Sequence, residues 1–308
     1  MIQLFKHFFD VILREIRISL HCILILLFAL LIPLQSACFP SKKVTIVATG
    51  SLLEDVGKSS YKQSDLRMIR EGMPAYLMLM DGMVEAWPDN EQLLISAAQG
   101  YSSFASAFIE DHDKEYAELL YKKGREYALR ALEKRGLKEP LHGALDNFEE
   151  DLKNLGKEDV AYIFWAAACW GNWIILNLGS MEALAELPRV ELMMQRVLEL
   201  DEGFYYGGPH LFMGIKFASR PEMFGGDLKK AQQHFLKALD LGKGRFLMAY
   251  VYYANHYARR VLDKNLFQST LKKVMETPAD IPPELTLLNT VAKKKAKALL
   301  DRANEYFD

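Results

Sequence analysis

The sequence predicts an all-α fold, built as an array of diverged helix pairs and closed by a C-terminal capping helix. Apolar residues recur at helical spacing through nearly all of residues 63–308. No segment beyond residue 62 shows the two-residue alternation of a half-buried strand. Small and aromatic residues also recur at matching places in successive helix pairs, which is typical of a repeat architecture.

The first 37 residues have the order of a secretion signal. Basic residues precede an apolar run at 22–34, and two small residues precede Cys38. The run is about 13 residues long, short of the roughly 20 that cross a bilayer. We therefore expect a lipoprotein signal peptide over 1–37, with Cys38 acylated, by palmitate or a similar chain, as the first mature residue. Gln35 departs from the usual leucine, and an uncleaved membrane helix or an ordinary signal peptide stays an alternative.

Residues 38–62 contain no long apolar period and are expected to form the lipid-anchored tether to a helical domain at 63–308. Removal of the signal leaves 35 basic and 38 acidic residues. This near-neutral balance gives no electrostatic basis for binding nucleic acid. Cys169 would be the remaining free thiol, and its apolar neighbours indicate a buried, unreactive group.

The helices can be justified in order along the chain. Residues 73–87 place Leu77, Met80 and Val84 on one side, and Pro88-Asp89-Asn90 ends this helix before the next begins. The next predicted helix, 91–109, is rich in small residues. The helix predicted at 114–135 has alanines and a glycine on its inner side. Residues 140–155 form a connection with a short amphipathic helix. Further pairs are expected at 159–178 with 188–200, at 208–217 with 227–241, and at 245–262 with 266–276.

The last predicted helix, 284–306, follows the break at Pro282-Pro283. Its run Lys293-Lys294-Lys295 lies on a helix that also carries Ala292, Ala296, Leu299 and Leu300, which predicts the solvated face of a capping helix.

The recurring residues follow the tetratricopeptide pattern, in which small residues let two helices approach and aromatic residues fill the gap between pairs. The clearest case has Gly214 and Phe217 on the first helix and Ala231, Phe235 and Ala238 on the second. Two further cases begin with Ala97, Ala98 and Tyr101 and with Ile163, Ala166, Ala167 and Trp170, and a fourth around Tyr250, Tyr253 and Tyr257 is degenerate. The sequence thus predicts about four repeat-like pairs.

Four stretches resemble the T component of periplasmic TRAP transport systems. They are PDNEQLLISAAQGYSSFASAF at 88–108, AYIFWAAACWGNWIIL at 161–176, LPRVELMMQRVLELDEGF at 187–204 and GGPHLFMGIKFASRPEMFGGDLKKAQQHFLKAL at 207–239. The resemblance implies a tetratricopeptide-type lipoprotein that assembles as a homotrimer. It also implies a hydrophobic channel through each subunit and docking of the substrate-binding P component.

Aromatic residues are candidates for the lining of such a channel. Trp173 and Trp170 lie roughly 80° and 140° around their helix from Trp165, so the helix is enclosed or borders a cavity. The candidate set is Trp165, Trp170, Trp173, Tyr205, Tyr206, Phe212 and, as a polar group at the mouth, His210. The alternative for each ring is ordinary core packing, and for His210 a structural cap or buried hydrogen bond.

No catalytic motif is present: the chain has no Walker loop, HExxH or GxSxG. The seven histidines show no metal-ligand spacing, and we expect no metal, no cofactor and no enzyme activity. The predicted function is a periplasmic scaffold, anchored to the inner or outer membrane, that docks the P component. It would hold or pass a hydrophobic ligand such as an organic or fatty acid. The alternatives are an architectural envelope lipoprotein without ligand transport, and an envelope enzyme or enzyme regulator.

Overall fold

The computed structural model describes residues 42–307 and, further upstream, positions 14, 17, 19–21, 23 and 25. The chain divides into two units, 1–49 and 50–308, and the helical domain is the second. Cys38 and the junction expected beside it lie outside the described residues. All regular structure in the described part is helical, which confirms the all-α prediction.

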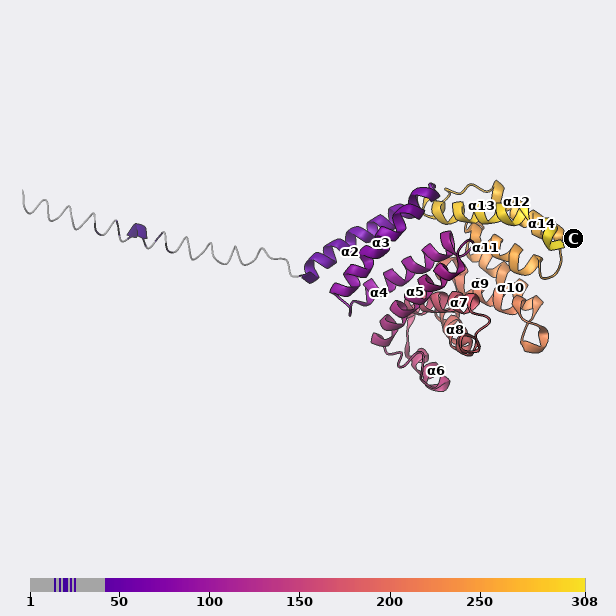
Figure 1. Cartoon of the computed structure of the whole chain (residues 1–308), viewed down its shortest axis with the longest axis horizontal. Helices are drawn as coiled ribbons and strands as arrows, with labels where there is room; N and C mark the ends of the chain where they lie inside the picture. Colours follow the sequence, from indigo (N-terminus) through magenta and orange to yellow (C-terminus); the bar gives the residue numbers. More distant parts are fainter. Residues whose placement is uncertain are drawn as a thin grey trace, which may run out of the picture. The chain divides into compact units, whose positions relative to one another are not determined.

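The helices of the domain follow one another from α3 to α14, as the colour sequence of Figure 1 shows. They are α3 (Leu66–Ala86), α4 (Glu91–Phe104) with the π-helical η1 (Ala105–Ile109), α5 (Lys114–Lys134), α6 (Leu145–Asn154), α7 (Val160–Leu176), α8 (Met181–Leu200), α9 (Phe204–Ser219), α10 (Leu228–Leu241), α11 (Leu247–Tyr252) with the π-helical η4 (Tyr253–Ala258), α12 (Lys264–Glu276), α13 (Thr286–Asp301) and α14 (Ala303–Phe307). Upstream, α2 spans Lys42–Tyr61.

Polar side chains set where many of these helices begin. Asp65, Asn90, Asp113, Asp227 and Asp263 each accept a hydrogen bond from a backbone N–H two or three residues later. Such a cap satisfies a donor that the helix itself leaves unpaired and contributes about 1 kcal/mol.

Neighbouring helices pack in pairs: α4 on α5, α7 on α8, α9 on α10, and α11 with η4 on α12. Successive pairs are joined by contacts such as α5 with α7 and α8 with α9, and α13 packs on both α11 and α12. The core follows these contacts, with Trp170, Tyr121, Phe235 and Phe267 among its fully buried side chains. The equivalence of the pairs as repeats stays a prediction.

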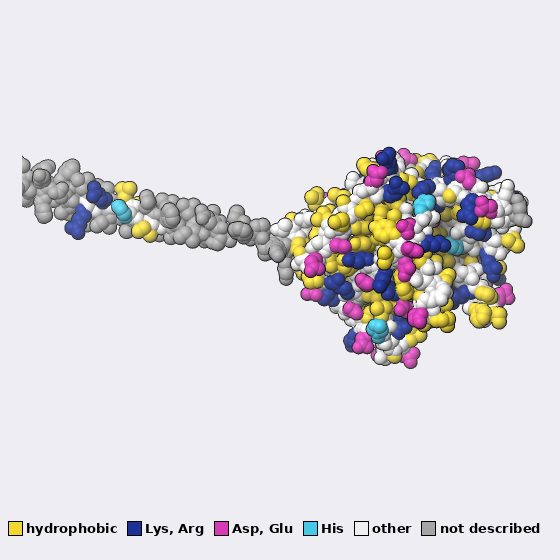
Figure 2. Space-filling view, viewed as in Figure 1, with side chains coloured by type: hydrophobic (Ala, Val, Ile, Leu, Met, Phe, Trp, Pro, Cys, Tyr) yellow, Lys and Arg dark blue, Asp and Glu magenta, His cyan; other side chains and the backbone are white. Residues whose placement is uncertain are grey.

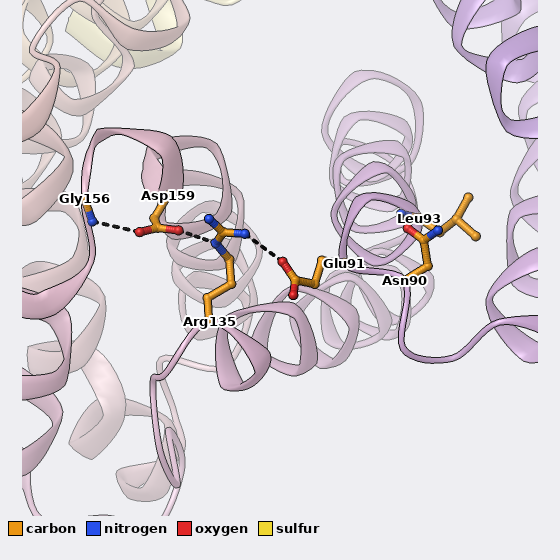
Figure 3. A network of polar contacts seen from close by, with 6 residues as sticks. All are labelled: Asn90, Glu91, Leu93, Arg135, Gly156 and Asp159. Carbon is orange, nitrogen blue, oxygen red and sulfur yellow. Dashed lines mark hydrogen bonds and ion pairs between the residues drawn. The ribbon is translucent and has the colours of Figure 1, made fainter. Parts of the chain in front are cut away.

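A polar network fixes the first two pairs to each other, and Figure 3 shows it at close range. Arg135, just after α5, donates to Glu91 Oε2 at 2.7 Å, at the start of α4, and to Asp159, just before α7. Asp159 also accepts from the Gly156 N–H at 2.7 Å. One guanidinium therefore ties three helix ends together, since its planar fork can serve two carboxylates at once.

Several expected boundaries were wrong. Most of the predicted tether, Lys42–Tyr61, forms helix α2, which the sequence analysis did not predict; its role as a tether stays a prediction. Helices α3 and α8 begin before the predicted starts at 73 and 188, so Pro74 and Pro188 lie inside them rather than at their first turns. The expectation of a solvated lysine face was wrong for Lys295, whose side chain is 16% exposed and carries ion pairs.

Candidate functional site

The predicted channel residues do not form one group, and the first cluster contains Trp165, Tyr205 and Tyr206. Trp165 on α7 and Tyr205 on α9 have ring centroids 5.0 Å apart, and both contact Phe164. Tyr206 stacks on Phe246 at 5.0 Å, and Tyr205 contacts Phe246 edge-on at 5.9 Å. These five rings, which we call the inner aromatic cluster, join α7, α9 and the start of α11.

An unusual backbone turn presents the two tyrosines. Tyr205, Tyr206 and Gly207 are consecutive left-handed residues, with φ of 47°, 59° and 80°. Left-handed geometry is unfavourable for residues with a Cβ, and such strain concentrates at functional sites. Gly207 has a second reason to be glycine, because a Cβ there would lie 3.0 Å from Ala238 Cα. At Gly208 it would lie 2.7 Å from the ring of Phe164, so the Gly-Gly pair permits close packing on both sides.

His210 is buried one helical turn beyond this bend. Its Nδ1 lies 2.9 Å from Nδ1 of His234, and its Nε2 lies 3.2 Å from Glu202 Oε2. An ionised Glu202 can only accept, so Nε2–H of His210 donates to it. Nδ1 of the neutral His210 ring then accepts from Nδ1–H of His234. Burial lowers the pKa of both imidazoles. At His210 the Glu202 carboxylate partly opposes this shift. The structure thus gives His210 a buried hydrogen-bond network, and its place at a channel mouth stays a prediction.

The other two tryptophans belong to a different group, around Arg125 on α5. Trp170 is fully buried, and its Nε1 donates to Glu186 Oε2 at 2.6 Å. Arg125 donates to the same oxygen at 2.9 Å and lies 4.2 Å from the Trp173 ring centroid. Trp173 is partly buried, and its Nε1 has no hydrogen-bond partner within the described chain. Trp170 therefore packs as a core residue in this structure.

Phe212 contacts neither tryptophan group through a ring pair in the described residues. Its ring is 3.8 Å from the position that a Cβ of Gly171 on α7 would occupy. Phe212 thus fills the space left by glycine between α7 and α9.

The predicted packing residues lie where helices approach each other. Ala97, Ala98, Ala231, Phe235 and Ala238 are fully buried, Tyr101 is buried, and Phe217 is partly buried. A Cβ on Gly214 would lie 2.9 Å from the Phe235 ring, so α9 and α10 cross closely there. Tyr101 also donates to Asp81 at 2.8 Å, which links α4 to α3.

Tyr61, Tyr205, Tyr252 and His256 are each only partly exposed. Burial raises the pKa of each phenol and lowers that of His256 to about 4, so all four are neutral near pH 7.

The sequence prediction missed Tyr61, Tyr252 and His256. Tyr252 and His256 are four residues apart, and their ring centroids are 5.8 Å apart on one face of the α11–η4 segment. A spacing of four residues puts two side chains on one face of a helix, so the sequence held a signal for this pair, but it lies in the degenerate fourth repeat. Tyr61 lies in the stretch that the sequence predicts as a tether.

Within the described part of the chain, no group of three His, Cys, Asp or Glu side chains is arranged to hold a metal ion. Among those residues, the stretch Lys157–Leu176 has the length and apolar composition of a membrane span, yet 61% of its apolar window is buried in the domain. That burial is typical of the core helix of a soluble domain.

Comparison with known proteins agrees with this architecture. The chain is 22% identical over 265 residues to an uncharacterized protein of Treponema pallidum (strain Nichols), a match that covers 80% of this chain and 81% of that protein. The family model for the TRAP transporter T-component matches residues 62–307, which is nearly the whole helical domain. The family is a transport component rather than a known enzyme family, and it is the one that the sequence stretches resemble. The chain belongs to the TRAP transporter T-component family.

Proposed function

We propose that this component of a membrane-associated TRAP system docks the periplasmic P component and holds or passes an apolar ligand through its own interior. The observation that carries the proposal is the inner aromatic cluster itself, in which neighbouring ring centroids lie 5.0 to 5.9 Å apart and Tyr205 stays partly exposed. Aromatic walls favour apolar ligands because they exclude water and offer large contact areas. An organic or fatty acid is the ligand class expected from the sequence.

The position of the protein follows from the same proposal. Acylation of Cys38 would anchor it to a membrane, with the helical domain in the periplasm. Residues 38–62, which include α2, would then separate the anchor from the domain.

The surface of the domain supports docking and assembly. Figure 2 shows hydrophobic side chains gathered between charged ones on the face in view. Large apolar side chains that are more than two-thirds exposed include Met78, Met181, Met223, Phe224 and Leu262. Exposed apolar residues of this kind mark interaction surfaces, so a homotrimer and a bound P component would each cover part of them.

The test is to purify the full-length protein from membranes of its host and identify the small molecules that stay bound, by mass spectrometry. We expect an apolar organic compound at a constant ratio to protein, and co-purification of a solute-binding P component. A protein that carries no ligand and still assembles with envelope partners would favour the purely architectural lipoprotein. Light scattering on the same sample gives the subunit number, and a strict monomer would contradict the trimer.

A further inference from the structure

The outer side of helix α3 is apolar and uncovered. Six residues recur there at alternating intervals of four and three positions, which places them within an arc of roughly 80° around the helix. All six are exposed and none is charged: Met68, Gly72, Ala75, Leu79, Gly82 and Ala86. Met78, at the edge of this arc, is 75% exposed. We call these seven residues the α3 face.

No other part of the described chain covers the α3 face. A Cβ added to Gly72 or Gly82 would meet nothing within 4 Å. The buried residues of α3 lie elsewhere on the helix: Ile69, Leu77, Met80, Met83 and Val84. Helix α2 packs on that buried side as well, since a Cβ on Gly50 would lie 3.5 Å from Met83 Cε. A contiguous apolar surface that stays open in a folded domain marks a contact with something outside the chain.

Charged side chains border the α3 face and do not interrupt it. Arg67 and Glu71, paired at 2.8 Å, lie near its start, and Glu85 lies near its end. The charged residue between them is Asp81. Its carboxylate accepts hydrogen bonds from the hydroxyls of two buried tyrosines, on α4 and α5, at 2.8 and 2.7 Å. The face therefore presents an apolar strip with polar ends, which is the pattern of a helix that lies at a lipid surface.

The upstream chain limits how far this face can lie from a membrane. Acylation of Cys38 would place that residue at the bilayer surface. Cys38 precedes the first residue of α2 by four positions, and Gly50 lies eight positions further along α2. With about 3.5 Å per extended residue and 1.5 Å per helical residue, Gly50 lies at most about 26 Å from Cys38. Gly50 packs on Met83, which is one helical turn from Leu79, so the α3 face is within reach of the bilayer.

We infer that the α3 face rests on the lipid surface that carries the anchor, with Met78 and Leu79 inserted at the boundary between headgroups and acyl chains. The small residues Gly72, Ala75 and Gly82 keep the rest of the face flat, so the helix can lie along the surface. The tether holds a lipid surface near this face in every anchored molecule, which is the reason to assign it to lipid rather than to a second copy of the chain.

This second contact would fix the orientation of the domain relative to the membrane, which the acyl chains alone do not fix. The inference rests on the proposed acylation of Cys38 and adds to it a membrane-contacting surface of the folded domain.

Quenching of site-specific fluorophores by lipid tests it on the full-length lipoprotein in phospholipid nanodiscs. Cys169 is buried and acylation blocks Cys38, so an added cysteine can be labelled selectively. An environment-sensitive fluorophore is attached at Met78→Cys, at Leu79→Cys, or at the control Met223→Cys between α9 and α10, where the native side chain is 82% exposed. Phospholipids brominated near the headgroup end of the acyl chain serve as quenchers.

We expect brominated lipid to reduce the emission of the probes at Met78→Cys and Leu79→Cys, and to leave that at Met223→Cys unchanged. In protein labelled at Met78→Cys, Leu79→Glu should abolish the quenching, because a carboxylate enters the lipid boundary unfavourably, whereas the matched Leu79→Ala should retain most of it. Unchanged emission at Met78→Cys, or equal quenching at Met223→Cys, would overturn the inference.

Two further readouts separate the alternatives. A probe at Met78→Cys that is shielded from water without quenching by lipid, and only when a nanodisc holds several copies, would assign the α3 face to a second copy and overturn the lipid contact. Mass spectrometry of the same sample reports the anchor. Acylated protein without quenching contradicts the α3 face alone, whereas an unmodified Cys38 contradicts the proposed anchor and this inference with it.

Discussion

Lys295 Nζ on α13 lies 3.0 Å from Glu110 Oε1, which directly follows η1, although the two residues are 185 positions apart in the sequence. Lys295 also lies 2.8 Å from Asp111 Oδ2, and Glu110 accepts from the Tyr121 hydroxyl at 2.5 Å. We call this group the closing cluster, because it joins the first helix pair to the last long helix.

Removal of the lysine should loosen this closure. Lys295→Met keeps the aliphatic stem but leaves Glu110 without its cation, and we expect a loss of about 2 kcal/mol in the free energy of unfolding. Urea denaturation followed by circular dichroism measures it. The matched control is Lys294→Met on the exposed neighbour, which should change stability by less than about 0.5 kcal/mol. Equal effects of the two substitutions would show that the closing cluster contributes nothing specific.

Enlarging a small residue at the α9–α10 crossing should also destabilise the domain. Ala238 is fully buried, and its Cα lies 3.0 Å from where a Cβ on Gly207 would stand. Ala238→Leu is expected to overpack this site and to cost about 1–3 kcal/mol. The control is Leu236→Ala on the same helix, where the side chain is 49% exposed. An unchanged melting temperature for Ala238→Leu would refute the crossing.

Stability should fall as the pH is lowered from about 6.5 to about 4. Burial, assisted by Arg259, lowers the pKa of His256 to about 4, whereas the unfolded chain takes up this proton near pH 6.5. In that window the unfolded state binds more protons, so acid favours it, by at most about 1.4 kcal/mol per pH unit for this group. His256→Gln should flatten the profile measured by urea unfolding. His210 and His234, whose pKa values are also lowered by burial, would contribute to the slope that remains.

The two tryptophan environments predict different outcomes of truncation. Trp170→Ala removes a fully buried ring and its bond to Glu186, and should cost about 3–5 kcal/mol of stability. Trp165→Ala opens the inner aromatic cluster and should, in protein that still folds, reduce the amount of bound apolar ligand. Unfolding curves and ligand content are measured on the same preparations. Undiminished ligand in a folded Trp165→Ala protein would remove Trp165 from the ligand site.

The lipid anchor can be checked directly. Mass spectrometry of the protein from membranes should find acyl chains on Cys38 and a mature product that begins there. Each buried CH₂ contributes about 0.8 kcal/mol, so a multiply acylated cysteine holds firmly. Cys38→Ala should abolish both the lipid and the lipoprotein cleavage, which leaves a longer precursor. An unmodified Cys38 in the parent protein would contradict the anchor.

The sequence was most informative about helices, and least about where they begin and how they bend. Apolar spacing and caps such as Asn90 and Asp227 located the pairs because both signals are local. The predicted starts of α3 and α8 were too late, because Pro74 and Pro188 suit the first turn of a helix. Proline is also tolerated farther inside a helix when other contacts hold it. The π-helical segments have no local pattern comparable to a cap.

The candidate site was only partly predictable, because grouping of side chains depends on tertiary structure. Composition identified the tryptophans, but only the packing of α5 and α8 separates Trp170 from Trp165. Lys295 lies in a run of three lysines, and such a run predicts side chains exposed to solvent. Its partners come from the first pair, at a separation that no local pattern reports.

The closing cluster has a consequence for how this protein can evolve. An open solenoid lengthens by duplication of a unit, because each unit needs only its neighbours. Here Glu110 and Lys295 meet only when the intervening helices bring α13 back to the first pair, so an added or deleted pair would separate them. Gain or loss of a whole helix pair would therefore remove the closing cluster, whereas a substitution elsewhere or a change in loop length would leave it in place.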